Sequence, residues 1–102
     1  MEIDGVSVNF KLSCLMLLIK DEKDWENELE HLSWLEQKVN DCCLYFMTKE
    51  YKSMYFMNLE LCLIDVHFVY EIPESCQNLL DAMQANIAEY GVRLNIHMEN
   101  EK

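Results

Sequence analysis

Residues 54–72, MYFMNLELCLIDVHFVYEI, carry the strongest strand signal in the chain. Leucine recurs at every second position in the middle of this stretch, and β-branched and aromatic residues continue it to Ile72. This pattern predicts a β-strand, because alternate side chains of a strand face opposite sides of a sheet. The length predicts a strand in the centre of a sheet, with a bulge near Asp65. Pro73 ends it.

The residues that follow predict a helix and a last strand. The sequence PESCQNLLDAMQANIAEYG, residues 73–91, begins a helix at Glu74 or Ser75 and ends it with Gly91. Its apolar positions recur at helical spacing and form the expected buried face: Cys76, Leu79, Leu80, Met83 and Ile87. The alternating sequence VRLNIHM, residues 92–98, closes the domain as a strand.

A longer helix precedes the central strand. Asp24 is a suitable N-cap, and the acids after it oppose the helix dipole. Apolar residues then recur every three or four positions through about six turns: Trp25, Leu29, Leu32, Leu35, Val39, Cys42 and Phe46. The polar stretch 48–53 ends this helix.

Residues 3–20 alternate and then become continuously apolar, which predicts either one long bent strand or a hairpin. We favour a hairpin that turns near residues 9–13. The chain is then a single domain, residues 1–102, with the order β(β)αβαβ. Two helices on one face of a small sheet of three or four strands make a two-layer α/β sandwich. The other face of the sheet stays open, and Cys62 and Ile64 would make it apolar enough to dock another molecule.

The net charge of −11, from 19 acidic and 8 basic residues, restricts the partners. Nucleic acids and anionic membranes need Lys and Arg, so we expect neither. A basic protein partner fits, although acidity can also serve solubility alone. The amino terminus has no signal-peptide pattern, and the apolar run CLMLLI is short, which favours the cytoplasm. The five cysteines are expected to be reduced.

No motif predicts catalysis, a cofactor or a metal. The cysteines and histidines lack the spacing of metal ligands, and neither a phosphate-binding loop nor a nucleophile elbow is present. We therefore expect a protein that is not an enzyme. His31 is predicted to be structural, bonded to the acids at the helix start or to Asp21.

Trp34 stands apart from the apolar face of the first helix. On a helical wheel it falls with Tyr45 among polar residues, one turn after Glu30 and one turn before Lys38. Either the segment 48–53 or the amino terminus covers it, or it is an aromatic anchor for a partner. In the second case the partner-binding residues are Trp34, Tyr45, Glu26, Glu30, Gln37, Asp41, Asp21, Glu22 and Asp24.

Two stretches resemble a small acidic bacterial α/β family of unknown function. LLIKDEKDW has the family's apolar strand ending in Asp21, with Trp25 one residue later than the pattern has it. EHLSWLEQKVN has its helix motif, carried here by His31, Leu32, Leu35, Glu36, Lys38, Val39 and Asn40. The members are similar in kind to the immunity proteins encoded beside bacterial toxins.

Three functions remain open. The first is an immunity protein that inhibits a cognate toxin, such as a nuclease, by covering its basic active-site surface. The second is a phage-type inhibitor that mimics nucleic acid and blocks a defence nuclease. The third is a structural or regulatory module that forms a homodimer through the sheet edge or Trp34.

Overall fold

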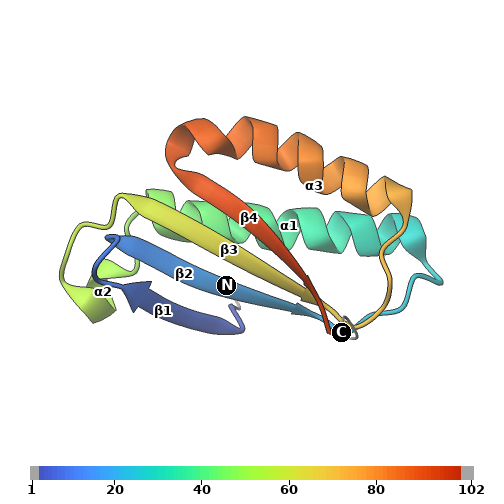
Figure 1. The fold of residues 1–102 in the computed structure, drawn as a ribbon, viewed down its shortest axis with the longest axis horizontal. Helices are drawn as coiled ribbons and strands as arrows, with labels where there is room; N and C mark the ends of the chain where they lie inside the picture. Colours follow the sequence, from blue (N-terminus) through green and yellow to red (C-terminus); the bar gives the residue numbers. More distant parts are fainter. Residues whose placement is uncertain (1–2, 100–102) are drawn as a thin grey trace.

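The computed structural model describes residues 3–99, and their elements follow the order ββαβαβ with one short additional helix. The elements are β1 (Gly5–Asn9), β2 (Cys14–Asp21), α1 (Glu28–Met47), α2 (Lys52–Tyr55), β3 (Leu61–Phe68), α3 (Glu74–Ile87), the 3₁₀ turn η1 (Ala88–Tyr90) and β4 (Val92–Met98). Figure 1 shows the long helices α1 and α3 running alongside the strands.

The four strands form one mixed sheet in the order β1-β2-β3-β4. β1 and β2 are an antiparallel hairpin that turns at residues 10–13, as predicted, and β2, β3 and β4 are parallel. The central position of β3 is also as predicted. Since β2, β3 and β4 are parallel and joined through helices, their carboxyl ends lie at one edge of the sheet.

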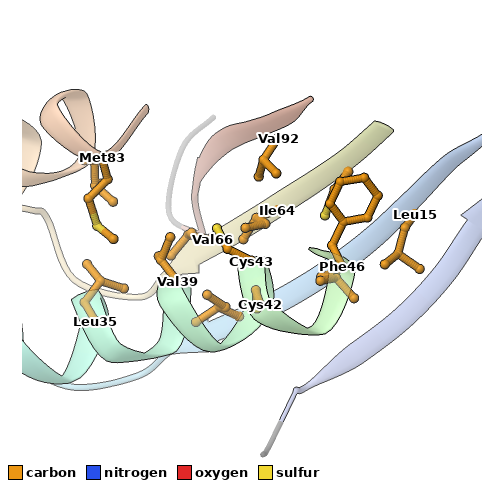
Figure 2. Close-up of a cluster of buried hydrophobic side chains, with 14 of the residues drawn as sticks. Leu15, Leu35, Val39, Cys42, Cys43, Phe46, Ile64, Val66, Met83 and Val92 are labelled. Carbon is orange, nitrogen blue, oxygen red and sulfur yellow. The ribbon is translucent and has the colours of Figure 1, made fainter. Parts of the chain in front are cut away.

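Side chains of the two central strands alternate between a covered and an open face of the sheet. On β2 and β3 the covered set is buried: Leu15, Leu17, Ile19, Cys62, Ile64, Val66 and Phe68. Figure 2 shows Ile64 and Val66 among Leu35, Val39 and Cys42 of α1 and Met83 of α3. The expectation that Cys62 and Ile64 lie on the open face is therefore wrong.

The start of α1 differs from the prediction. The helix begins at Glu28 after Asn27, whose side chain makes no capping bond, so Asp24 is not the N-cap. The Asp24 carboxylate instead accepts a hydrogen bond from the backbone N–H of Glu26, 3.1 Å away, in the turn before the helix. Trp25 consequently precedes the helix, and Leu29, expected on the buried face, is 82% exposed.

The central strand is shorter than predicted at both ends. Residues 52–55 form α2, and Phe56 ends it in the left-handed region, with φ 53° and 86% exposure. No bulge occurs at Asp65, because its register with β2 and β4 is unbroken. The last helix and strand agree with the prediction, and Gly91 (φ 79°) lies where a Cβ would come within 2.9 Å of the Glu60 carbonyl oxygen.

Candidate functional site

A pocket opens beside the carboxyl ends of β2 and β3, where parallel sheets commonly bind ligands. Its volume is about 420 Å³, and two loops and the first turns of α1 form it. The residues that line it are Glu22, Lys23, Asp24, Asn27, Glu30, His31, Trp34 and Tyr70. Figure 1 shows these loops together at the end of the molecule opposite α2.

A buried polar pair lies beside this pocket, and one of its members, His31, lines it. Asp21, the last residue of β2, is 1% exposed, and His31 on α1 is 4% exposed. The Nε2 atom of His31 lies 2.5 Å from Oδ2 of Asp21, and its Nδ1 atom donates to the carbonyl oxygen of Asp24 at 3.0 Å. The other oxygen of Asp21 accepts the backbone N–H of Lys23. The pair thus joins β2 to α1, and the predicted structural bond between His31 and Asp21 is confirmed.

Trp25 completes this inner cluster, defined as Asp21, Trp25 and His31. Its ring stacks on the imidazole of His31, with centroids 3.6 Å apart and an interplanar angle of 15°. It also packs at 6.4 Å from the ring of Phe68 in β3. Because the loop from 22 to 27 must fold back for these contacts, Trp25 cannot continue the helix.

Trp34 lies outside the inner cluster and forms the outer wall of the pocket. It is half-buried, with its ring edge-on to His31 at 6.0 Å. Two ammonium groups lie near its ring, with Nζ of Lys23 5.0 Å and Nζ of Lys38 5.7 Å from the centroid. Residues of the segment 48–53 line a different hollow. The prediction that this segment covers Trp34 is therefore wrong.

Three exposed acids surround the pocket, and we call them the acidic rim: Glu22, Asp24 and Glu30. Each was predicted to belong to the binding surface, and the structure brings all three together with Trp34. Asp21, predicted with them, is buried in the inner cluster and unavailable to a partner. The reason is geometric: Asp21 has its side chain on the covered face of β2, whereas the rim lies in the loop and on α1.

The other predicted residues lie elsewhere. Tyr45 is three helical turns from Trp34 and lines a separate hollow with Lys49 and Glu50, where burial raises its phenol pKa. Gln37 donates to the carboxylate of Asp41 at 2.9 Å, which ties these side chains to each other. Glu26 is exposed in the turn before α1 and does not line the pocket.

The prediction missed three residues that line the pocket. Lys23 is not among the predicted partner-binding residues, yet its ammonium lies over the ring of Trp34. Asn27 and Tyr70 received no role. Tyr70 follows β3, and the sequence offered a signal for it, because residues just after adjacent parallel strands meet at one edge of a sheet. This signal can be used only when the strand order is known, and the strand order could not be predicted from the sequence.

The cysteine thiols do not contribute to the pocket. All five cysteines are free and buried. Burial raises the thiol pKa of Cys42 and of Cys76 to about 12. Within residues 3–99, no three His, Cys, Asp or Glu side chains gather as they would around a metal ion. Among these residues, no helix combines the length and apolarity required to cross a bilayer.

Comparison with known proteins identifies a family. A family model described as a family of unknown function (DUF6572) covers residues 1–100. Neither a curated protein nor a solved structure matches the chain.

Proposed function

This chain belongs to DUF6572, a family of unknown function, and we propose that it is a non-enzymatic protein that binds a basic partner through the acid-rimmed pocket. In its most specific form the proposal is an immunity protein. Its partner is then a bacterial toxin, such as a nuclease, whose cationic active-site surface the pocket covers.

The observation that carries the proposal is the arrangement of cations around Trp34. The faces of indole rings attract cations, and here the ring is within 6 Å of the ammonium groups of Lys23 and Lys38. An arginine of a partner would stack better on this ring than a lysine does, because the guanidinium is planar and less strongly hydrated. We therefore propose that it replaces Lys23 in the bound state.

The acidic rim supports the same partner. The acids Glu22, Asp24 and Glu30 line the same pocket as the ring of Trp34. They can each accept hydrogen bonds from a guanidinium, which presents its donors in a fixed fork. The net charge of −11 would also steer a basic protein toward the surface and raise its association rate.

The state of His31 favours binding over catalysis. The backbone carbonyl oxygen of Asp24 can only accept a hydrogen bond, so Nδ1 of His31 is the donor and carries a proton. Nε2 shares a hydrogen with the Asp21 carboxylate. Neither ring nitrogen is left to move a proton to or from a molecule in the pocket, as a general base must. The five cysteine thiols are buried as well.

A peptide titration tests the pocket directly. A short peptide of alternating Arg and Gly is titrated into the protein by calorimetry, at low and high salt. We expect binding that Trp34→Ala weakens about tenfold or more, as for an interface hot spot. Glu30→Gln should weaken it about threefold. The matched control is Glu60→Gln, which removes the same charge at the amino end of β3 and should leave binding unchanged.

The same three variants test the identity of the partner. The tagged protein is incubated with lysate of its source cells, and any retained basic protein is assayed for toxicity and nuclease activity with and without the chain. Inhibition by wild type and Glu60→Gln, but not by Trp34→Ala, supports an immunity protein. A retained partner that all variants bind and inhibit equally would contradict the proposed surface.

A further inference from the structure

One edge of β4 has no neighbouring strand, because β4 ends the sheet. The carbonyl of Gly91 and the N–H of Glu99 bond to β3, at 2.9 Å each. The backbone N–H and C=O groups of successive residues point to opposite sides of a strand. Those of residues 92, 94, 96 and 98 therefore point away from β3, toward the free edge.

A side chain occupies only the first half of this edge. The amide of Gln84 on α3 donates to the Val92 carbonyl at 3.1 Å and accepts the Leu94 N–H at 2.7 Å. Among residues 3–99, no partner is found for the carbonyl of Leu94, the N–H and carbonyl of Ile96, or the N–H of Met98. β4 and α3 meet near the turn that joins them and diverge along this second half (Figure 1).

Proteins usually protect such edges with Pro, Lys or a covering element. β4 contains neither Pro nor Lys. The opposite edge of the sheet is partly covered, because the hydroxyl of Tyr55 in α2 bonds to the Val6 carbonyl of β1 at 3.5 Å. The second half of β4 is therefore the place where this sheet can accept another strand.

We infer that β4 pairs antiparallel with β4 of a second copy, with Ile96 opposite Ile96. The two Ile96 residues exchange two hydrogen bonds. The Met98 N–H of each copy then donates to the Leu94 carbonyl of the other, which gives two more. In this register the Met98 carbonyl of each copy points at the Leu94 N–H of the other, so the pairing displaces the Gln84 amide oxygen from that one N–H.

Side chains on the helix side of the edge support this register. Leu94, Ile96 and Met98 pack against the core but stay half-exposed. In the dimer, Ile96 faces Ile96, and Leu94 faces Met98 of the second copy. Each copy would thus cover the apolar row that the other leaves open, as a self-complementary two-fold interface requires.

Charges on the open face select the same register. Arg93 and Glu99 are exposed, and their side chains lie on the face opposite the helices. With Ile96 on the two-fold axis, Arg93 lies opposite Glu99 of the second copy, and symmetry repeats the pair. A shift by two residues would instead place His97 opposite His97. The two pockets point to opposite ends of this dimer, so the inference is independent of the proposed function.

Sedimentation equilibrium of the full chain over a concentration series tests the inference. We expect a dimer that dissociates on dilution. Ile96→Pro should give a monomer with an unchanged circular dichroism spectrum, because Pro removes an N–H that bonds to nothing within residues 3–99. The control is Val8→Thr in β1, at the opposite edge of the sheet, and this variant should remain dimeric. A wild-type chain that stays monomeric at all concentrations would overturn the inference.

A charge exchange tests the register. Arg93→Glu places like charges opposite each other twice and should raise the dissociation constant of the dimer about tenfold. Adding Glu99→Arg to the same chain restores opposite charges and should return the constant to within about twofold of the wild type. A dimer that neither Ile96→Pro nor Arg93→Glu weakens would show that another surface makes it.

Discussion

The inner cluster and the acidic rim occupy the same short stretch, residues 21–34, but differ in nearly every physical respect. Asp21 and His31 are almost fully buried and bonded to each other, whereas Glu22, Asp24 and Glu30 are exposed. A buried hydrogen-bonded pair that loses one partner leaves a buried polar group unsatisfied, while exposed charges are solvated and contribute little to stability. The first group should therefore determine stability, and the second should determine what the protein binds.

The largest expected effect comes from breaking the inner pair. Asp21→Asn leaves His31 facing an amide instead of a carboxylate and should lower the free energy of unfolding by about 3 kcal/mol. Urea denaturation followed by circular dichroism measures this change. Glu22→Gln, one residue along, removes the same charge from the rim and should change the free energy by less than about 0.5 kcal/mol. Equal effects of the two substitutions would erase the distinction between the groups.

The two tryptophans give the next largest contrast. Trp25→Ala removes the ring that stacks on His31 and packs near Phe68, and should cost about 2 to 3 kcal/mol of unfolding free energy. Trp34→Ala should cost about 1 kcal/mol, because its ring faces the pocket.

A conservative substitution shows whether stacking is the cause. Trp25→Phe keeps a ring over His31 and removes an indole N–H that is buried without an acceptor in residues 3–99. Its cost should be below about 1 kcal/mol. If Trp34→Ala unfolds the protein as readily as Trp25→Ala, Trp34 belongs to the core, and the pocket loses its separate role.

The thiols supply a third test, in which Cys76 reports on the inner cluster. Burial, together with the smaller effects of the negative charges of Asp21 and Glu28, raises its pKa from 9.0 to about 12. A thiol whose pKa is raised on folding stabilises the folded state fully below its unfolded pKa, and this contribution is lost as the pH rises toward the folded pKa. Stability should therefore fall between about pH 9 and pH 12.

Labelling with a thiol reagent at neutral pH measures the opening of the structure. In the wild type the buried thiols should react only when the chain opens. Asp21→Asn should accelerate this labelling about a hundredfold, in proportion to its loss of stability, whereas Glu30→Gln should leave the rate unchanged. Fast labelling of Cys76 in the wild type would contradict its burial.

The sequence predicted the layers of this fold because they depend on periodicity. The alternation at 92–98 and the helical spacing of Leu35, Val39, Cys42 and Phe46 agree with the structure. The start of α1 could not be predicted in the same way. Asp24 has the chemistry of an N-cap, but the contacts of Trp25 and His31 with β2 and β3 hold the loop in another conformation, and tertiary contacts override a local preference.

The candidate site was only partly predictable for the same reason. Trp34 and Glu30 share a helix, so a helical wheel placed them together. Glu22 and Asp24 followed as neighbours in the sequence, but Asp21 was grouped with them although a strand turns its side chain inward. Tyr70 enters the pocket from a loop that follows β3, a contact that depends on the parallel pairing of β2 and β3.

The smallest expected effect on stability belongs to Lys23, and it tests the proposed role of the rim most sharply. Lys23→Gln should change the free energy of unfolding by less than about 0.5 kcal/mol, because the ammonium is exposed. It should nevertheless strengthen binding of the Arg-Gly peptide about threefold. The substitution removes an ammonium group from the face of the Trp34 ring and makes the net charge around the acidic rim more negative.

Lys52→Gln is the matched control for this prediction. It makes the same change in net charge on α2, at the opposite end of a molecule 41 Å long. That separation exceeds the Debye length of about 8 Å at physiological salt, so the control should leave peptide binding unchanged. Weaker binding by Lys23→Gln would mean that Lys23 belongs to the binding surface instead of standing in for the partner's cation. Equal strengthening by both variants would mean that net charge, and not the pocket, attracts the peptide.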